Sequence, residues 1–106
     1  MKLQDIASFI KSANAGASYL TFDIGFPSAQ TFHRVAGSGV ITQELIAGLY
    51  PIRPADVEIY AYEPSLVIKI TIPRPVASGG LAERDFDGVQ QFAPLLDIDG
   101  PWEADA

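Results

Sequence analysis

The strongest constraint on the fold is a short stretch, residues 66–75, in which an alternating apolar segment runs into two prolines. Its apolar positions are Leu66, Ile68, Ile70 and Ile72. Lys69 and Thr71 lie between them, which is the period of a β-strand with one buried face. Pro73 and Pro75 lack backbone donors and favour an extended backbone. The sequence therefore predicts a strand over residues 66–72 that ends at the prolines.

Two further segments have the same period. Residues 57–62 alternate apolar and polar side chains, and the turn-forming residues 63–65 separate them from the strand at 66–72. This arrangement predicts an antiparallel hairpin. Residues 18–26 predict another strand, whose apolar face is Leu20, Phe22, Ile24 and Phe26.

Three segments have helical spacing. Leu3, Ile6, Ala7 and Ile10 predict a first helix that ends at residues 14–16, with Gly16 as its left-handed cap. Residues 29–38 predict a second helix capped by Ser28. Residues 42–50 predict a third helix, which Pro51 ends.

The order of these elements predicts an α+β fold, a small two-layer sandwich of about three strands with helices on one face. The 106 residues are enough for one domain with one core. We expect residues 1–75 to form the α+β core. Residues 76–106 are expected to form an extended docking tail, packed on that core or on a partner, because apolar residues near Leu95 follow a polar stretch.

Composition excludes several classes of function. The formal net charge is −6 and the basic residues are scattered, which argues against a nucleic acid or an anionic membrane as partner. The absence of cysteine excludes disulfides and thiolate chemistry. No apolar run is long enough to span a membrane. The lack of cysteine leaves the compartment open, and a cytoplasmic location is the default expectation.

Asp23 and Lys69 are the most suggestive pair of polar residues. Each lies on the polar face of a predicted strand, so the two share one surface if the strands are neighbours. Such a pair could bind a carboxylated ligand or support proton transfer. Without geometry, an ordinary cross-strand ion pair on a solvated face is the favoured interpretation.

The polar residues after the prolines allow two interpretations. Arg74 and Ser78, followed by two glycines, could form an anion cradle or simply a loop. Gln90 and Gln91 favour a structural or interface role. The acidic turns at residues 83–88 and 97–100 lack the final ligand of a calcium loop, and His33 is the only histidine, so no metal site is expected. No sequence motif indicates which cofactor, if any, the chain binds, so the cofactor is unknown. Trp102 could anchor against a partner or against its own core.

Several segments together resemble a family, the small domain of unknown function that accompanies AtuA-type proteins, which are named for acyclic terpene utilisation. The resemblance extends from Leu3 to about Leu96. It is carried by residues 12–16, 21–24, 38–42, 49–50, 68–75, 78–79 and 88–95. The chain has Ala13 where the family usually has lysine.

The resemblance implies a small subunit that docks on a large AtuA-like subunit, in clusters that break down organic acids or their CoA thioesters. A hydratase or hydro-lyase is the implied reaction type, with no activity expected of this chain alone. In that reading, Asp23 and Lys69 are catalytic, with Lys69 also holding a substrate carboxylate. The substrate-binding residues are Asn14, Arg74, Ser78, Gln90 and Gln91. The alternative is a non-catalytic binding or structural module that forms a homo-oligomer through its tail.

Overall fold

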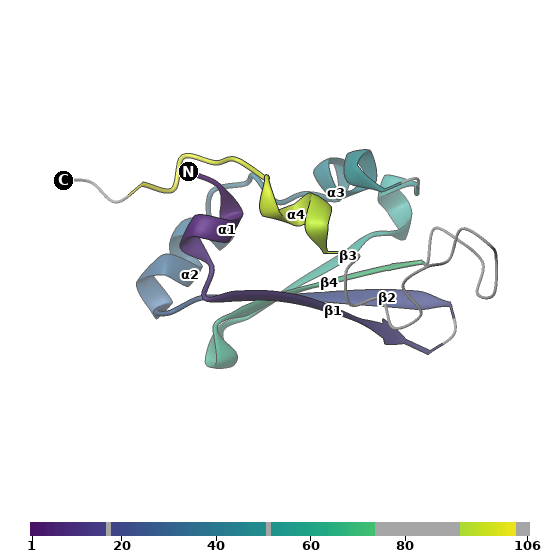
Figure 1. Cartoon of the computed structure of the whole chain (residues 1–106), viewed down its shortest axis with the longest axis horizontal. Coiled ribbons are helices and arrows are strands. Elements are labelled where there is room, and N and C mark those ends of the chain that lie inside the picture. Colours follow the sequence, from purple (N-terminus) through teal and green to yellow (C-terminus); the bar gives the residue numbers. More distant parts are fainter. Residues whose placement is uncertain (17, 51, 74–91, 104–106) are drawn as a thin grey trace.

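A four-stranded antiparallel sheet in the order β1-β2-β4-β3 forms one layer of the molecule (Figure 1). The computed structural model describes residues 1–16, 18–50, 52–73 and 92–103. The strands are β1 (Phe9–Ala15), β2 (Tyr19–Gly25), β3 (Glu58–Tyr62) and β4 (Val67–Pro73). Three of them confirm the strands expected at residues 18–26, 57–62 and 66–72, and the α+β class is confirmed. The sheet has four strands where about three were expected, because β1 adds one.

The prediction of a first helix was wrong over most of its length. Helix α1 covers only Leu3–Ile6, and the chain continues as β1. Strand β1 pairs with β2 along its whole length, from Phe9 opposite Gly25 to Ala15 opposite Tyr19. Gly16 does adopt the left-handed conformation, with φ +75°, but it lies in the turn of this β-hairpin and does not cap a helix.

The central strands β2 and β4 come from distant parts of the sequence. The chain leaves β2, passes through two helices, and returns as the β3–β4 hairpin, so that β4 pairs with β2 and β3 forms an edge. The hairpin is closed by the 3₁₀ turn η2 (Glu63–Ser65), after which Leu66 has a φ of 57°. This connection is what brings Asp23 and Lys69, 46 positions apart in sequence, into direct register.

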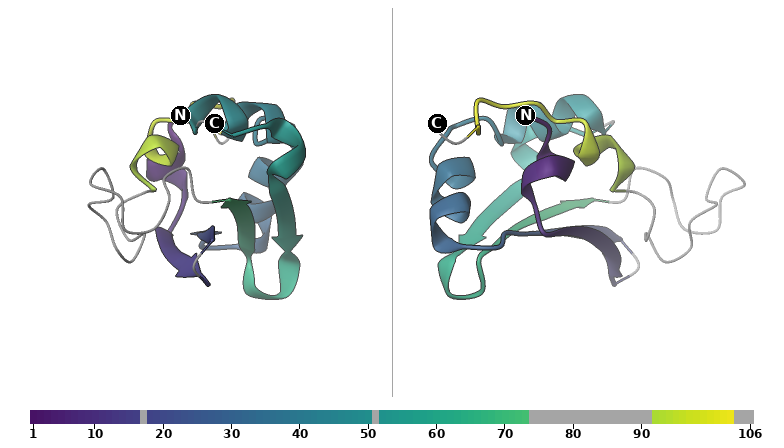
Figure 2. Two further views of the ribbon diagram at one scale, coloured as in Figure 1. Left: turned by 90° about the vertical axis from the view of Figure 1, so that its right-hand side faces the viewer. Right: turned by 60° about the vertical axis from the view of Figure 1, so that its left-hand side comes forward.

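The helices lie together on one side of the sheet (Figures 1 and 2). Besides α1 they are α2 (Ala29–Ala36), α3 (Gln43–Leu49), the 3₁₀ turn η1 (Pro54–Asp56) and α4 (Ala93–Leu96). The expected Ser28 cap is confirmed, since its hydroxyl accepts from the amide of Thr31. At the start of α3 the hydroxyl of Thr42 accepts from the amide of Leu45. None of these helices, in the part of the chain described, is long and apolar enough to cross a bilayer.

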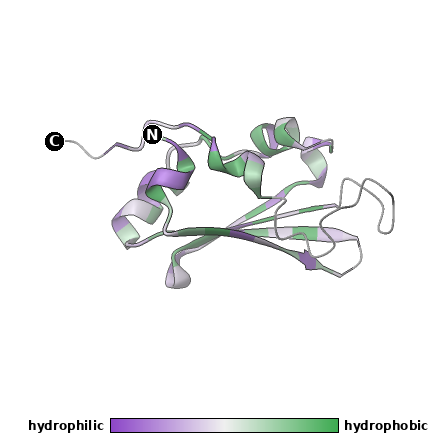
Figure 3. Ribbon diagram, in the orientation of Figure 1, coloured by the Kyte–Doolittle hydropathy of each residue, from purple (hydrophilic) through white to green (hydrophobic). Residues whose placement is uncertain are grey.

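The core lies between the two layers, and apolar residues occur in both (Figure 3). The sheet contributes Leu20, Phe22, Ile24, Ile68, Ile70 and Ile72. The other layer contributes Leu3, Phe32, Val35, Ile46, Leu95 and Trp102. Trp102 is fully buried, and its indole nitrogen donates to the hydroxyl of Ser38 at 3.0 Å. This settles the alternatives for Trp102, which packs against its own core.

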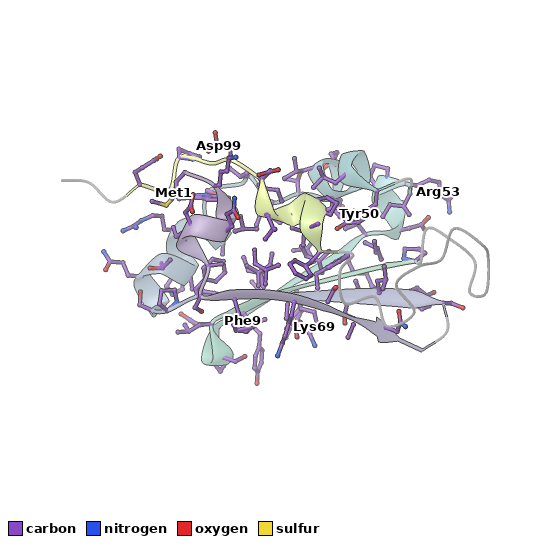
Figure 4. The ribbon with its side chains drawn as sticks, in the orientation of Figure 1. Met1, Phe9, Tyr50, Arg53, Lys69 and Asp99 are labelled. Atoms are coloured by element: carbon purple, nitrogen blue, oxygen red, sulfur yellow. The ribbon has the colours of Figure 1, made fainter. Side chains whose placement is uncertain are left out.

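The first and last described residues also meet in this layer. The amide of Leu3 donates to the carbonyl of Ile98, and Lys2 pairs with Asp97 at 3.2 Å. The amine of Met1 lies beside Asp99 and Glu103 (Figure 4). Hydrogen bonds to Glu103 and Asp99 raise the pKa of this amine, and the same bonds lower the pKa of both carboxyls. Residues 92–103 are therefore packed against the start of the chain. The proposed boundary at residue 75 falls among residues that the structure does not describe.

Candidate functional site

The side of the sheet that faces away from the helices is the candidate site, and we call it the open face. Residues directly opposite one another in an antiparallel pair point to the same side, so the register defines this face. Figure 4 shows Phe9 and Lys69 pointing away from the helices, whereas Tyr50 lies on the helix side. The open face consists of Phe9, Lys11, Ala13, Ala15, Tyr19, Thr21, Asp23, Gly25, Glu58, Tyr60, Tyr62, Val67, Lys69, Thr71 and Pro73.

Asp23 and Lys69 lie at the centre of the open face. They are opposite each other on β2 and β4, and 3.8 Å separates the Lys69 amine from Oδ1 of Asp23. The lysine side chain is about half exposed and the aspartate side chain less so. The expectation that they share one surface is confirmed, because their strands are neighbours in the sheet.

The carboxylate of Asp23 is not fully satisfied by the residues around it. Its Oδ1 is buried and, among the described residues, has no hydrogen-bond partner. At 3.8 Å the Lys69 amine is close enough for attraction but too far for a hydrogen bond. A buried acceptor without a donor costs about 1–3 kcal/mol. Oδ1 of Asp23 is therefore a buried acceptor that lacks a donor among the described residues.

The register extends the pair into a row of four side chains across the sheet. Lys11 lies opposite Asp23, and Tyr60 lies opposite Lys69, which gives the order Lys11–Asp23–Lys69–Tyr60. Tyr60 stacks on Tyr62, with their rings 6.2 Å apart, and the Lys11 amine lies 5.1 Å from the centre of the Phe9 ring. Charged groups at the centre of the face are thus flanked by aromatic rings.

Two shallow hollows lie at the β3 side of this row. One, of about 440 Å³, is lined by Asp23, Lys69, Tyr60, Tyr62, Ser65 and Val67. The other, of about 670 Å³, lies along the β3 edge of the sheet, where Gln43, Val57 and Ile59 also line it, and it shares Tyr60 and Lys69 with the first. Lys69 can hold an anionic group there, Asp23 can accept a proton or a hydrogen bond, and the tyrosine rings can cover apolar surface. The hollows are open to solvent, so they form half of a site and would need a second surface to enclose a ligand.

Asn14 does not belong to this cluster. It lies on β1 opposite Leu20, which is buried on the helix side of the sheet. Asn14 is half-buried on that side and is separated from Asp23 and Lys69 by the sheet. The structure therefore does not bring these three predicted site residues together.

The remaining predicted site residues lie outside the described residues. These are Arg74, Ser78, Gln90 and Gln91. Of the two acidic turns, 83–88 is likewise outside, whereas Asp97 and Asp99 form ion pairs with Lys2 and the Met1 amine. No group of three metal-ligating side chains occurs in the ranges that the structure describes. His33 lies on the exposed surface of α2 in contact with Glu63.

Sequence reasoning missed Lys11, Phe9, Tyr60 and Tyr62 as neighbours of the central pair. Lys11 and Phe9 were missed because their segment was assigned to a helix. The alternation in residues 57–62 did place Tyr60 and Tyr62 together on one side of a strand. That signal, combined with Lys69 on the next strand of a hairpin, was sufficient to put the tyrosines on the same face as Lys69, although not to fix which of them lies opposite it.

Comparison with known proteins gives one match. A family model described as a domain of unknown function, DUF4387, matches residues 3–99. Neither a curated protein nor a solved structure matches the chain.

Proposed function

Because the chain belongs to the DUF4387 family of domains of unknown function, we propose that it is a small accessory subunit that completes a site on a larger partner protein. The observation that carries this proposal is the Asp23–Lys69 pair, which lies at the centre of a sheet face that no described residue covers. The shallow hollows beside it suit a surface that a second protein closes. Such a surface fits a subunit better than an autonomous enzyme.

The partner that we propose is a large AtuA-like subunit, on the strength of the sequence resemblance. In the complex, Lys69 would hold a carboxylate of an organic acid or of its CoA thioester, since a lysine amine is a point charge suited to an anion. Asp23 would orient Lys69 or act as the base in a hydration or dehydration. Both residues are accessible from the side on which the partner would dock.

The first test is co-expression of the tagged chain with a large AtuA-like protein from the same organism. We expect a stable species whose mass, measured by light scattering, equals the sum of the two proteins. Elution of the chain without the large protein would overturn the proposal and favour a module that acts only with copies of itself.

The second test separates docking from chemistry. Lys69→Ala should abolish turnover of candidate acids by the complex, while the complex still forms, because the anion loses its counter-charge. Lys2→Ala is the matched control, since the Lys2 side chain has the same 52% exposure as that of Lys69 and also forms one ion pair, but lies on the helix side. Wild-type turnover by the Lys69→Ala complex would show that the lysine has no catalytic or binding role.

A further inference from the structure

The open face carries most of the large apolar side chains that the described residues expose. Phe9, Tyr19, Tyr60 and Tyr62 are between 40% and 62% exposed, and all of them lie on this face. Only Met1 is exposed to a similar degree elsewhere in the described part of the chain. Exposed aromatic side chains gathered on one face are typical of a protein-binding surface.

The charges of this face cancel, in contrast to those of the whole chain. It carries two basic residues, Lys11 and Lys69, and two acidic residues, Asp23 and Glu58. The formal charge of the chain is −6, so all of this excess lies on other residues. Two copies of the chain repel each other overall, and the open face is where that repulsion is weakest.

The order of residues in the central row is complementary to itself. A two-fold axis parallel to the strands and midway between β2 and β4 would stack two sheets with β2 of one copy over β4 of the other. The row Lys11–Asp23–Lys69–Tyr60 would then face its own reverse. Asp23 would meet Lys69 of the second copy, and Lys11 would meet the ring of Tyr60 of the second copy, where a cation is attracted.

The row next to the central one is also complementary under the same two-fold rotation. Phe9 and Tyr62 are at opposite ends of one row. Phe9 of each copy would therefore lie over Tyr62 of the other copy and form an aromatic pair with it. Sheets that pack face to face lie about 10 Å apart, within reach of these long side chains.

We propose that two copies of this chain pair through their open faces, about a two-fold axis parallel to the strands. Four strands about 4.8 Å apart and seven residues of about 3.3 Å give a footprint of about 440 Å². A standard interface buries about 800 Å² per partner, so this dimer is weak and forms as the concentration rises. The inference does not rest on the accessory-subunit proposal. If both hold, the large subunit and the second copy compete for the same face.

The test is the mass of the purified full chain, measured by analytical ultracentrifugation from low micromolar to millimolar concentration. The wild type is expected to shift from monomer to dimer. In a Lys69→Asp dimer, Asp23 of each copy would face the new acidic side chain at position 69 of the other copy. In an Asp23→Lys dimer, Lys69 of each copy would face the new basic side chain at position 23 of the other copy. Each variant alone should therefore remain monomeric. An equimolar mixture of the two should regain the dimer mass, because each acidic face then meets a basic one. Changes within one chain cannot produce that recovery.

Two controls keep the result interpretable. Arg53→Asp makes the same change of charge at an exposed residue away from the open face, and should dimerise like the wild type. Tyr60→Ser removes an exposed ring without touching the core, so it folds even if the charge variants do not, and should weaken the dimer at least tenfold. A wild type that stays monomeric at every concentration would overturn the proposal. So would a wild-type dimer that Tyr60→Ser leaves unchanged, or a mixture of folded charge variants that stays monomeric.

Discussion

Tyr50 is the buried residue whose ionisation the fold disturbs most clearly. Its side chain is 5% exposed and stacks on Phe22 of β2, with the rings 5.3 Å apart. Burial raises the pKa of the Tyr50 phenol well above its ordinary value of about 10. The neutral phenol is thus the form that the core accommodates.

Stability should therefore fall at high pH. The neutral phenol contributes fully to the free energy of unfolding below about pH 10. This contribution is lost as the pH rises further, because Tyr50 then ionises in the unfolded chain but not in the folded chain. Tyr50→Phe should make the decline in stability above about pH 10 shallower, as measured by urea unfolding between pH 8 and pH 11. Tyr19→Phe is the control, since Tyr19 is half exposed. Equal slopes for the wild type and Tyr50→Phe would contradict this account.

The sequence could predict the Asp23–Lys69 pair because both residues lie on polar positions of strongly alternating strands. Successive side chains of a strand point to opposite faces, so the position of a residue in its strand, together with the pairing of the two strands, decides which side of the sheet it faces. Asn14 could not be placed in this way, since its strand was not recognised. Which residues of β1 and β3 continue the row depends on register, which no single strand encodes.

At the scale of elements, β1 shows why the first segment was assigned wrongly. Ser12 and Asn14 face the helix side of the sheet, so polar side chains interrupt the alternation that reveals a strand. The apolar residues between Leu3 and Ile10 meanwhile match a helical period. Pairing with β2 outweighs this local preference, as tertiary context often does. The cap residue Ser28 was predictable because a cap depends on neighbouring residues alone.

Two glycines in different elements should respond in opposite directions to the same substitution. Gly48 lies inside α3, where a Cβ would contact nothing within 4 Å, so Gly48→Ala should stabilise the protein by about 0.5–1 kcal/mol. Gly16 has a φ of +75° in the β1–β2 turn, so Gly16→Ala should destabilise it by about 1–2 kcal/mol. Urea unfolding of both variants measures the difference. A stabilised Gly16→Ala variant would mean that the turn does not require the left-handed conformation.

At the scale of the whole molecule, the core joins the two ends of the chain to the sheet. Leu3 from the start and Leu95 and Trp102 from the end are all fully buried in the same cluster as the central strands. The sequence predicted apolar anchors in this last segment but could not show what they contact. That contact depends on the packing of segments that are nearly a hundred residues apart in sequence.

This shared core predicts a single unfolding transition. Trp102 is the only tryptophan, so its fluorescence reports on the last segment, while far-UV circular dichroism reports on the sheet and helices. The two signals should have the same midpoint in urea, as expected for a small domain that unfolds in one step. A fluorescence midpoint at lower urea would show that residues 92–103 detach before the sheet unfolds.

The meeting of residues 1 and 2 with residues 97–103 also bears on how the chain can be joined to other proteins. Both regions lie on the helix side of the molecule, away from the open face (Figures 1 and 4). A second protein joined before residue 1 or directly after residue 103 would therefore emerge on that side and leave the sheet free to bind. A short peptide bridge between residues 103 and 1 would equally allow the chain to be cut at an exposed turn and retain the fold as a circular permutant.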